Sequence, residues 1–229
     1  MEQASSVMRL LEFADSTFPV GTFSFSNALE SAVVEGVVHD VDTLESFTKA
    51  VADQSSFTDG VASQIAYRAV LGEDYERLLA ADRQVDMLKL NAESRLMLTR
   101  MGKKMAELSI HIFDNGMMNR WSKDIAEGNA PGTYPIAQAI TFAACHITAF
   151  DLFCAQQYGV MNMVLSAALR CMKVSHFDTQ RILFKLSSNV MDDFVVVSQM
   201  DFEEMNAFVP EVDILSSIHE KGKMRMFMS

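Results

Sequence analysis

The sequence contains few of the residues that interrupt helices. Only 4 of its 229 residues are Pro and 10 are Gly, whereas 49% are hydrophobic. An all-β architecture draws on Gly and Pro for its many turns, so this composition favours packed helices. A disordered chain is excluded because the hydrophobic fraction is too high. We therefore expect an all-α fold.

Cysteine is also scarce. Cys145, Cys154 and Cys171 are the 3 cysteines, and no two of them form a CxxC pair. Such spacing fits neither a disulfide scaffold nor a zinc site, and it is typical of free thiols in a reducing compartment. The start of the chain, Met1 to Arg9, lacks the basic segment and long apolar run of a signal peptide. These features predict core thiols and a cytoplasmic protein.

Positive charge is limited. The chain has 19 Lys and Arg against 30 Asp and Glu, for a formal net charge of -11. Binding to nucleic acid depends on clustered cations that displace counterions from the phosphates, and the basic residues here are scattered. Nucleic acid is therefore excluded as the expected partner.

The segment from Gly128 to Leu169 contains a single charged residue, Asp151, and is the best candidate for a membrane span. Polar residues such as Gln138, His146 and Gln156 interrupt it, and a bilayer would leave those groups unpaired. We expect no membrane span, but a pair of helices buried in the core or in an oligomer interface.

Catalytic and metal-binding motifs are missing from the sequence. There is no Gly-rich loop ending in Gly-Lys-Ser/Thr, so a phosphate loop is not predicted. Glu107 and His111 share a helical face, but two ligands without a third do not make a metal site. Cys145 and His146 are adjacent and point about 100° apart on a helix. We expect no catalytic residue, no metal ligand and no cofactor.

What the sequence has in abundance is helical periodicity. A first helix covers Met8 to Phe13 and ends near Ser16, and a loop from Thr17 to Phe23 contains Pro19 and Gly21. The helical pattern resumes at Ser24, and Gly36 is placed to close that helix in a left-handed conformation. Asp42 is interpreted as the N-cap of the next helix, with Glu45 completing a capping box.

Further helices follow to the end of the chain. The series Met97, Met101, Met105, Leu108 and Ile112 is amphipathic, and Trp121 lies in a shorter helix. After a loop at 128–135, two helices are expected over about 136–157 and 160–172, with a break at Gly159. Asp178 is interpreted as an N-cap, 194–197 is the one candidate strand, and a last helix follows Pro210.

No repeat or linker divides the chain. We therefore expect one domain over 1–229, a bundle of about ten helices, with a C-terminal tail from about residue 210. That tail carries Met224, Met226 and Met228 among basic residues. Because thioether side chains adapt to irregular apolar surfaces, we expect it to dock on a partner or back on the domain.

One irregular segment carries a family resemblance. Residues 15–30 read Asp-Ser-Thr-Phe-Pro-Val-Gly-Thr-Phe-Ser-Phe-Ser-Asn-Ala-Leu-Glu, which resembles the N-terminal signature of the UreF family of urease accessory proteins. Residues 167–180 resemble its Ala-Ala-x-Arg segment leading to Asp-x-Gln, and residues 219–229 resemble its ending. The chain departs from the family where Lys173 to His176 replaces Pro-Leu-Gly-Gln, and where Thr133 and Tyr134 replace a His before Pro135.

The resemblance implies a non-catalytic, all-α homodimer. Family members join a second accessory protein, UreD (also called UreH), and the GTPase UreG, and the assembly delivers nickel to apo-urease. The resemblance and the side-chain chemistry together predict partner-binding residues in the signature, in the segment after it and in the tail, namely Phe18, Pro19, Gly21, Phe23, Ser24, Glu30, Gln180, His219, Arg225 and Phe227.

Several of these predictions have a plainer alternative. Phe18, Phe23 and Phe25 either anchor a partner or fill the core. Glu30 either pairs with a basic partner residue or lies on a solvated helix face. Arg225 either forks onto a carboxylate across an interface or is simply hydrated.

A different class of function is also open at this point. Gln138, His146 and Asp151 could line a pocket between the apolar helices after Pro135. The chain would then be a helical small-ligand-binding protein or enzyme.

Overall fold

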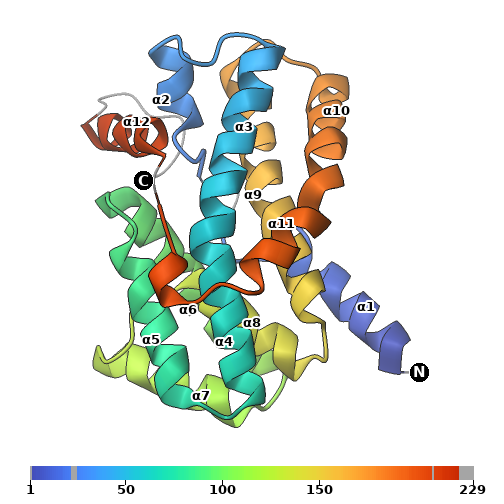
Figure 1. Cartoon of the computed structure of the whole chain (residues 1–229), viewed down its shortest axis with the longest axis vertical. Helices are drawn as coiled ribbons and strands as arrows, with labels where there is room; N and C mark the ends of the chain where they lie inside the picture. The colour runs from blue at the N-terminus through green and yellow to red at the C-terminus, as the bar shows by residue number, and fades with distance from the viewer. Residues whose placement is uncertain (1, 22–24, 208, 222–229) are drawn as a thin grey trace.

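The computed structural model describes residues 2–21, 25–207 and 209–221, and every regular element in those residues is a helix. The all-α prediction is confirmed (Figure 1). The α-helices are α1 (Glu2–Ala14), α2 (Leu29–Val34), α3 (Val41–Ser55), α4 (Val61–Leu71), α5 (Tyr75–Met87), α6 (Ala92–Ile112), α7 (Gly116–Glu127), α8 (Tyr134–Ala144), α9 (Ala149–Cys171), α10 (His176–Leu186), α11 (Val190–Val197) and α12 (Pro210–Lys221). A π-helical turn, Ser56–Gly60, joins α3 to α4, and 3-10 turns occupy Ser187–Asn189 and Phe202–Glu204.

The first predicted helix boundaries are wrong by a few residues. Helix α2 begins at Leu29 rather than Ser24, because Asn27 and Ala28 have φ values of 49° and 64° and cannot continue a right-handed helix. Gly36 has the left-handed φ of 74° that was predicted. Asp40, not Asp42, is the N-cap of α3, and it forms a capping box with Thr43.

The break in the apolar segment was also misplaced. The chain turns at Cys145 to Thr148, where His146 has φ 56° and Ile147 N donates to the Phe142 carbonyl at 2.9 Å. Thr148 then caps α9, which runs through Gly159 without interruption. A mid-helix Gly costs only about 1 kcal/mol, and the burial of its neighbours on a 23-residue helix outweighs that.

Two smaller predictions fail for related reasons. Ser175 is the N-cap of α10, and Asp178 is the third residue of the capping box whose side chain bonds back to Ser175. The candidate strand 194–197 is the end of α11. Its β-branched residues favour a strand only where neighbouring strands pair with it, and the described chain has none.

The buried side chains form two apolar clusters, and most of the helices that carry them lie in the lower and in the upper half of Figure 1, respectively. We call them the lower core, which includes Ile65, Leu78, Met105, Trp121, Ile136, Phe142 and Phe153, and the upper core, which includes Leu29, Leu44, Val164, Leu165, Ile182 and Val212. Helices α4 to α8 surround the lower core, whereas α2, α3, α10 and α12 enclose the upper core with the second half of α9.

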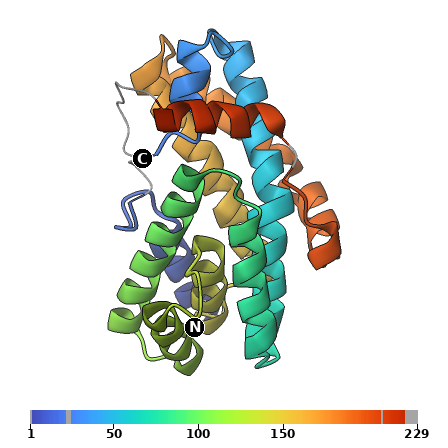
Figure 2. The same cartoon turned by 90° about the vertical axis from the view of Figure 1, so that its left-hand side faces the viewer.

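Helix α9 joins the two clusters. It contributes Phe153 to the lower core and Val164 to the upper core, so its length spans both. Helix α12 crosses over the upper part of the molecule, as Figure 2 shows from the side. No helix in the described residues is both long enough and apolar enough to span a bilayer.

Candidate partner-binding surfaces

The signature segment forms a tight loop before α2. Thr17 N donates to Asp15 Oδ1 at 2.6 Å, and Phe18 N donates to the Asp15 carbonyl at 3.0 Å. These bonds close a turn of the kind that a leading Asp favours. Gly21 follows with φ 92°, a conformation that glycine adopts without strain. Pro19 and Gly21 are exposed.

The aromatic residues of this loop pack inward where the structure describes them. Phe18 is half-buried and lies edge-to-face on Phe13, with ring centroids 5.2 Å apart. Phe25 is 6% exposed and belongs to the lower core. For these two residues the core-packing alternative holds in the isolated chain. Phe23 and Ser24 lie outside the described residues.

Glu30 is not on a solvated face, so that alternative is wrong. It is 7% exposed in the first turn of α2 and has interactions within the chain. It also influences Cys171, because burial together with the Glu30 charge raises the pKa of that thiol to about 11.

The signature loop and helix α12 meet in space. Val20 and Phe25 from the loop, and Val212 and Ser216 from α12, line one cavity of about 160 Å³. Helix α12 packs against both α2 and α6. The main chain of His219 lies in the last turns of α12, whereas Arg225 and Phe227 lie outside the described residues.

Gln180 belongs to a different surface. It is exposed on α10, and in Figure 1 this helix lies on the side of the upper half opposite α12. The predicted partner-binding residues are therefore divided between at least two surfaces.

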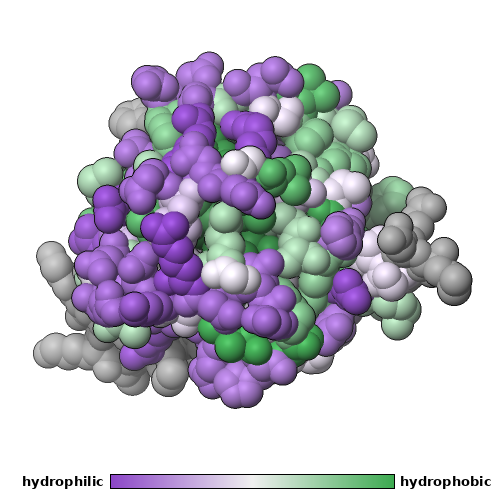
Figure 3. Space-filling view, turned by 90° about the horizontal axis from the view of Figure 1, so that it is seen from below, coloured by the Kyte–Doolittle hydropathy of each residue, from purple (hydrophilic) through white to green (hydrophobic). Residues whose placement is uncertain are grey.

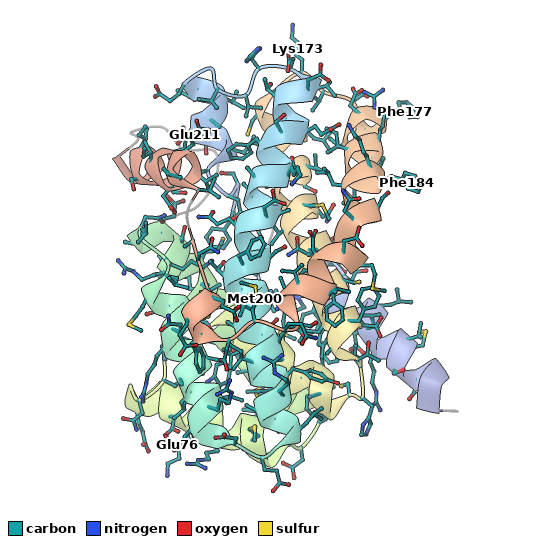
Figure 4. The ribbon with its side chains drawn as sticks, in the orientation of Figure 1. Glu76, Lys173, Phe177, Phe184, Met200 and Glu211 are labelled. Atoms are coloured by element: carbon teal, nitrogen blue, oxygen red, sulfur yellow. The ribbon has the colours of Figure 1, made fainter. Side chains whose placement is uncertain are left out.

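The structure adds two residues that the sequence reasoning missed. Phe177 is 89% exposed and Phe184 is 81% exposed, and both point outward from α10 in Figure 4. They are seven residues apart, so they lie on the same helical face, while Ile182 points into the upper core. The sequence contained a signal for them. The apolar face that identified this helix consists of Ile182, Leu183 and Leu186, and the two phenylalanines lie outside that face.

A second exposed apolar strip lies on α1. Val7, Met8 and Leu11 are all more than half exposed. Seen from below, hydrophilic side chains dominate the half of the molecule that carries α5 and α7, and hydrophobic side chains gather toward the side of α1 (Figure 3).

A buried carboxylate fixes the loop before α8. Asp82 is fully buried and accepts hydrogen bonds from Trp121 Nε1 at 2.9 Å, Gly132 N at 3.1 Å, and Thr133 N and Oγ1 at 2.9 and 2.6 Å. Burial raises the pKa of Asp82, although all four donors act against that rise. Thr133, a departure from the family pattern, thus supplies two of the donors.

The chemistry of the thiols argues against a nucleophile. Burial raises the pKa of Cys154 and of Cys171 to about 11, and it raises that of Cys145 as well. The reactive thiolate is therefore scarce at neutral pH. Among the described residues, no three His, Cys, Asp or Glu side chains lie close enough to hold a metal ion. His111 Nδ1 instead bonds the Glu107 carbonyl at 2.8 Å.

The predicted pocket is only partly right. Gln138 lines the cavity described above, but His146 is exposed and Asp151 bonds Thr148 at the start of α9. Neither of these two residues lines the cavity, because the chain turns at His146 and not at Gly159.

Comparison with known proteins identifies the family. The UreF family model matches residues 38–187. The chain is 44% identical over 225 residues to proteins named urease accessory protein UreF from Yersinia pestis (strain Pestoides F), Yersinia pseudotuberculosis serotype IB (strain PB1/+) and Yersinia enterocolitica serotype O:8, and each match covers 98% of both chains. The chain therefore belongs to the UreF family, the non-catalytic urease accessory proteins that act in urease maturation.

Proposed function

We propose that this protein is the scaffold of a cytoplasmic nickel-insertion complex. It would bind a UreD/UreH-type accessory protein, a UreG-type GTPase and apo-urease, and it would modulate the GTPase while the urease nickel centre matures. Membership of the UreF family supports this proposal, and so does the free state of all 3 cysteines. We also propose that 1–229 forms one domain, since α9 passes through both cores.

The single observation that supports a scaffold most directly is the pair of exposed phenylalanines on α10. Large aromatic side chains dominate the binding energy of protein interfaces, and an isolated chain gains nothing by hydrating them. We propose that α10 packs against α10 of a second copy. In such a two-fold interface the same patch of both subunits is buried, so both phenylalanines of each subunit contribute to it.

The polar residues of α10 are compatible with that interface. Arg181 lies on the same helix and contacts Asp178 at 3.2 Å, and its side chain is 70% exposed. A guanidinium at this position is available to fork onto an acceptor across the interface. Gln180 is exposed beside it.

The loop and the C-terminal segment supply the proposed surface for the other accessory proteins. The predicted residues there are Phe18, Pro19, Gly21, Phe23, Ser24, Glu30, His219, Arg225 and Phe227. The convergence of the loop and α12 at one cavity supports placing them together. The burial of Glu30 and Phe25 suggests that they shape this surface rather than touch the partner directly.

The test is to make Phe177→Asp and Phe184→Asp together and to measure the molar mass by light scattering after gel filtration. Burying one phenylalanine at an interface contributes about 1.5–3 kcal/mol to the free energy of association. Loss of both should therefore raise the dissociation constant of the dimer at least about 100-fold. Far-UV circular dichroism should stay unchanged, because neither side chain contributes to a core. Met87→Asp, at a 65% exposed position on α5, is the matched control and should leave the dimer intact.

The same proteins then test the scaffold. The wild type, co-expressed with a UreD/UreH-type protein and a UreG-type GTPase, should be recovered in one complex and should support urease activation. The proposal would be rejected if the protein stayed alone in this experiment. A double variant that remained a dimer would reject the α10 interface in particular.

A further inference from the structure

Positive charge, which is scattered over most of the chain, gathers on one helix of the lower core. Arg95, Arg100, Lys103 and Lys104 all belong to residues 95–104 of α6, and no acidic residue lies between them. The chain as a whole is acidic, with a formal net charge of -11. This stretch of α6 therefore has a charge opposite to that of the molecule.

The cations lie on the outward face of a fixed helix. Met101 and Met105 on the inward face of α6 are buried in the lower core, so the helix cannot rotate without exposing them. Arg95, Arg100 and Lys103 are exposed. In Figure 2, α6 (green) runs down the left of the view, below α12. The basic face is thus presented to solvent on a rigid element.

Most of this charge is not neutralised within the chain. Lys104 contacts Glu107 at 3.0 Å, whereas Arg95, Arg100 and Lys103 form no ion pair with any residue that the structure describes. Arg100 and Lys103 are three residues apart on the helix, so their like charges repel each other. Carboxylates supplied by another molecule would relieve that repulsion.

An apolar side chain lies among the cations. Leu96 is 39% exposed, and the steps from Leu96 to Arg100 and from Arg100 to Lys103 are of four and three residues, so these side chains are neighbours on the helix surface. Protein interfaces are enriched in Arg and place a polar rim around an apolar centre. The outward face of α6 therefore has the composition of a protein-binding surface.

The length of the basic stretch argues against nucleic acid. At 1.5 Å per residue, Arg95 and Lys104 are about 14 Å apart along the helix axis, and Glu93 and Glu107 lie beyond the two ends. A site on nucleic acid neutralises about 6–10 phosphates, which is more than four cations supply. A cluster of Asp and Glu side chains on a protein is the counterpart of matching size.

This face adjoins the surface already proposed for the other accessory proteins. Ser94 and Met97 at the start of α6 come together with Phe25 and Asn27 of the signature segment and Ser216 of α12 around one small cavity. Helix α12 also packs against α6. A protein that covers the loop and α12 therefore reaches the first cations of α6.

We propose that the outward face of α6 binds an acidic patch of the protein partner that covers the signature loop and α12. The inference rests on the proposed function, to which it adds this face and the charge of the partner. Arg95 and Arg100 fork onto carboxylates of that patch, and Leu96 packs between them. At physiological ionic strength charges are screened beyond about 8 Å, so the local cations and not the net charge govern the contact.

The test combines Arg95→Gln, Arg100→Gln and Lys103→Gln in one α6 variant. The probes are the UreD/UreH-type protein and the UreG-type GTPase, each used in turn, and the dissociation constant is measured. For the partner that covers the loop, the loss of three charge pairs should raise it at least about tenfold in 0.1 M salt. The difference should shrink in 1 M salt, because the screening length falls from about 10 Å to about 3 Å.

The matched control combines Lys49→Gln, Lys123→Gln and Lys173→Gln. It removes the same charge from exposed positions outside α6, and the dissociation constant should change by less than about twofold. Urea denaturation followed by Trp121 fluorescence separates binding from folding. The free energy of unfolding of the α6 variant should not fall, since the three replaced side chains belong to neither core.

A second measurement identifies the chemistry of the contact. A carbodiimide joins a Lys amine to a neighbouring carboxylate as an amide, with loss of water. In the wild-type complex it should link Lys103 to an Asp or Glu of the partner, and mass spectrometry of the digested complex locates that link.

The outcomes separate this inference from the proposed function. A complex that forms equally well with the wild type and with the α6 variant would overturn the inference and leave the proposed function in place. No complex with the wild type would reject the proposed function, and the inference with it. If the wild type retained a short DNA duplex that the α6 variant released, a protein would be the wrong partner for this face.

Discussion

The lower and upper cores of this molecule are stabilised differently. Among the largest fully buried side chains, all except Leu29 and Leu44 belong to the lower core, which includes Trp121, Phe142 and Phe153. The upper core is smaller, and α10 and α12 around it expose Phe177, Phe184 and Ile214 to solvent.

This difference indicates that the lower core mainly stabilises the fold, whereas the outer faces of the helices around the upper core are available for binding. Close packing of large side chains makes the lower core costly to change, because each lost methylene also leaves a cavity. Helix α10 covers the upper core on one face and exposes Phe177 and Phe184 on the other, whereas the apolar side chains exposed on α4 to α8, such as Leu71 and Met87, include no phenylalanine among the described residues. We therefore expect substitutions in the lower core to affect folding, and substitutions on the outer faces of α10 and α12 to affect assembly.

The largest effect is expected at the centre of the lower core. Asp82→Ala would leave four buried donors, on Trp121, Gly132 and Thr133, without an acceptor. At about 1–3 kcal/mol for each unsatisfied group, the free energy of unfolding should fall by at least about 3 kcal/mol. Urea denaturation followed by the fluorescence of Trp121, the single tryptophan, measures this loss directly.

Asp86→Ala is the control for Asp82, since Asp86 lies one turn further along α5 and is only half-buried. Its effect should stay within about 0.5 kcal/mol. If Asp82→Ala cost no more than the control, the buried network would not hold the loop before α8, and the contrast between the two cores would lose its main support.

A smaller effect is expected from a pair of helical glycines. A Cβ at Gly102 on α6 would overlap the Gly132 carbonyl oxygen and lie 2.5 Å from the Thr133 carbonyl carbon, and main-chain atoms cannot easily move away. Gly102→Ala should therefore lower the free energy of unfolding by about 1–3 kcal/mol. Gly159→Ala, where the added methyl meets open space, should instead raise it by about 0.5–1 kcal/mol.

Thermal or urea unfolding of the two variants side by side checks the sign as well as the size. Two substitutions of the same type in two helices should move stability in opposite directions. A loss at both positions would mean that the space beside Gly159 is not open in the folded protein.

The smallest effect is expected in the segment that links α11 to α12. Arg77 on α5 bonds Asp201 at 2.5 Å and lies 5.1 Å from the ring centre of Phe202. The Arg77 guanidinium holds the pKa of Asp201 below its ordinary value. The stabilisation from this carboxylate is therefore present above about pH 4 and is lost as the pH falls through the lower, folded-state pKa.

The side chain of Asn does not titrate, so the stability of the Asp201→Asn variant should lack the decrease on acidification that comes from this carboxylate. Because both side chains are more than a third exposed, solvent screening limits the effect to less than about 1 kcal/mol. The measurement is the free energy of unfolding of the wild type and the variant between about pH 2 and pH 5. The ordinary and lowered pKa values of Asp201 set this window. A double-mutant cycle with Arg77→Met isolates the interaction between Arg77 and Asp201. If the unfolding free energy depends on pH equally in the wild type and in Asp201→Asn, the pair contributes nothing to stability.

The fold was largely predictable because the apolar periodicity is strong. The amphipathic series from Met97 to Ile112 predicted α6 and its C-terminal end, although the helix begins five residues earlier, at Ala92. Trp121 correctly indicated a further helix. Helix boundaries were less predictable. Ala28 and His146 adopt left-handed conformations that residues other than glycine seldom adopt, so the residue types did not indicate these two turns.

The candidate surfaces were predicted less well than the fold. The residue types of the signature segment do not distinguish an aromatic that fills the core, such as Phe25, from one that faces a partner. The exposure of Phe177 and Phe184 depends on how α10 is rotated against α3 and α9, and their apolar character by itself suggested burial.

The sequence by itself determined that this chain is helical, acidic and a UreF-type accessory protein, because periodicity, composition and an irregular motif are local properties of the chain. The tertiary structure decided that the signature loop and α12 meet at one cavity and that α10 presents two phenylalanines to solvent. Those facts depend on the packing of helices that are distant in sequence, and no local pattern encodes the rotation of one helix against another.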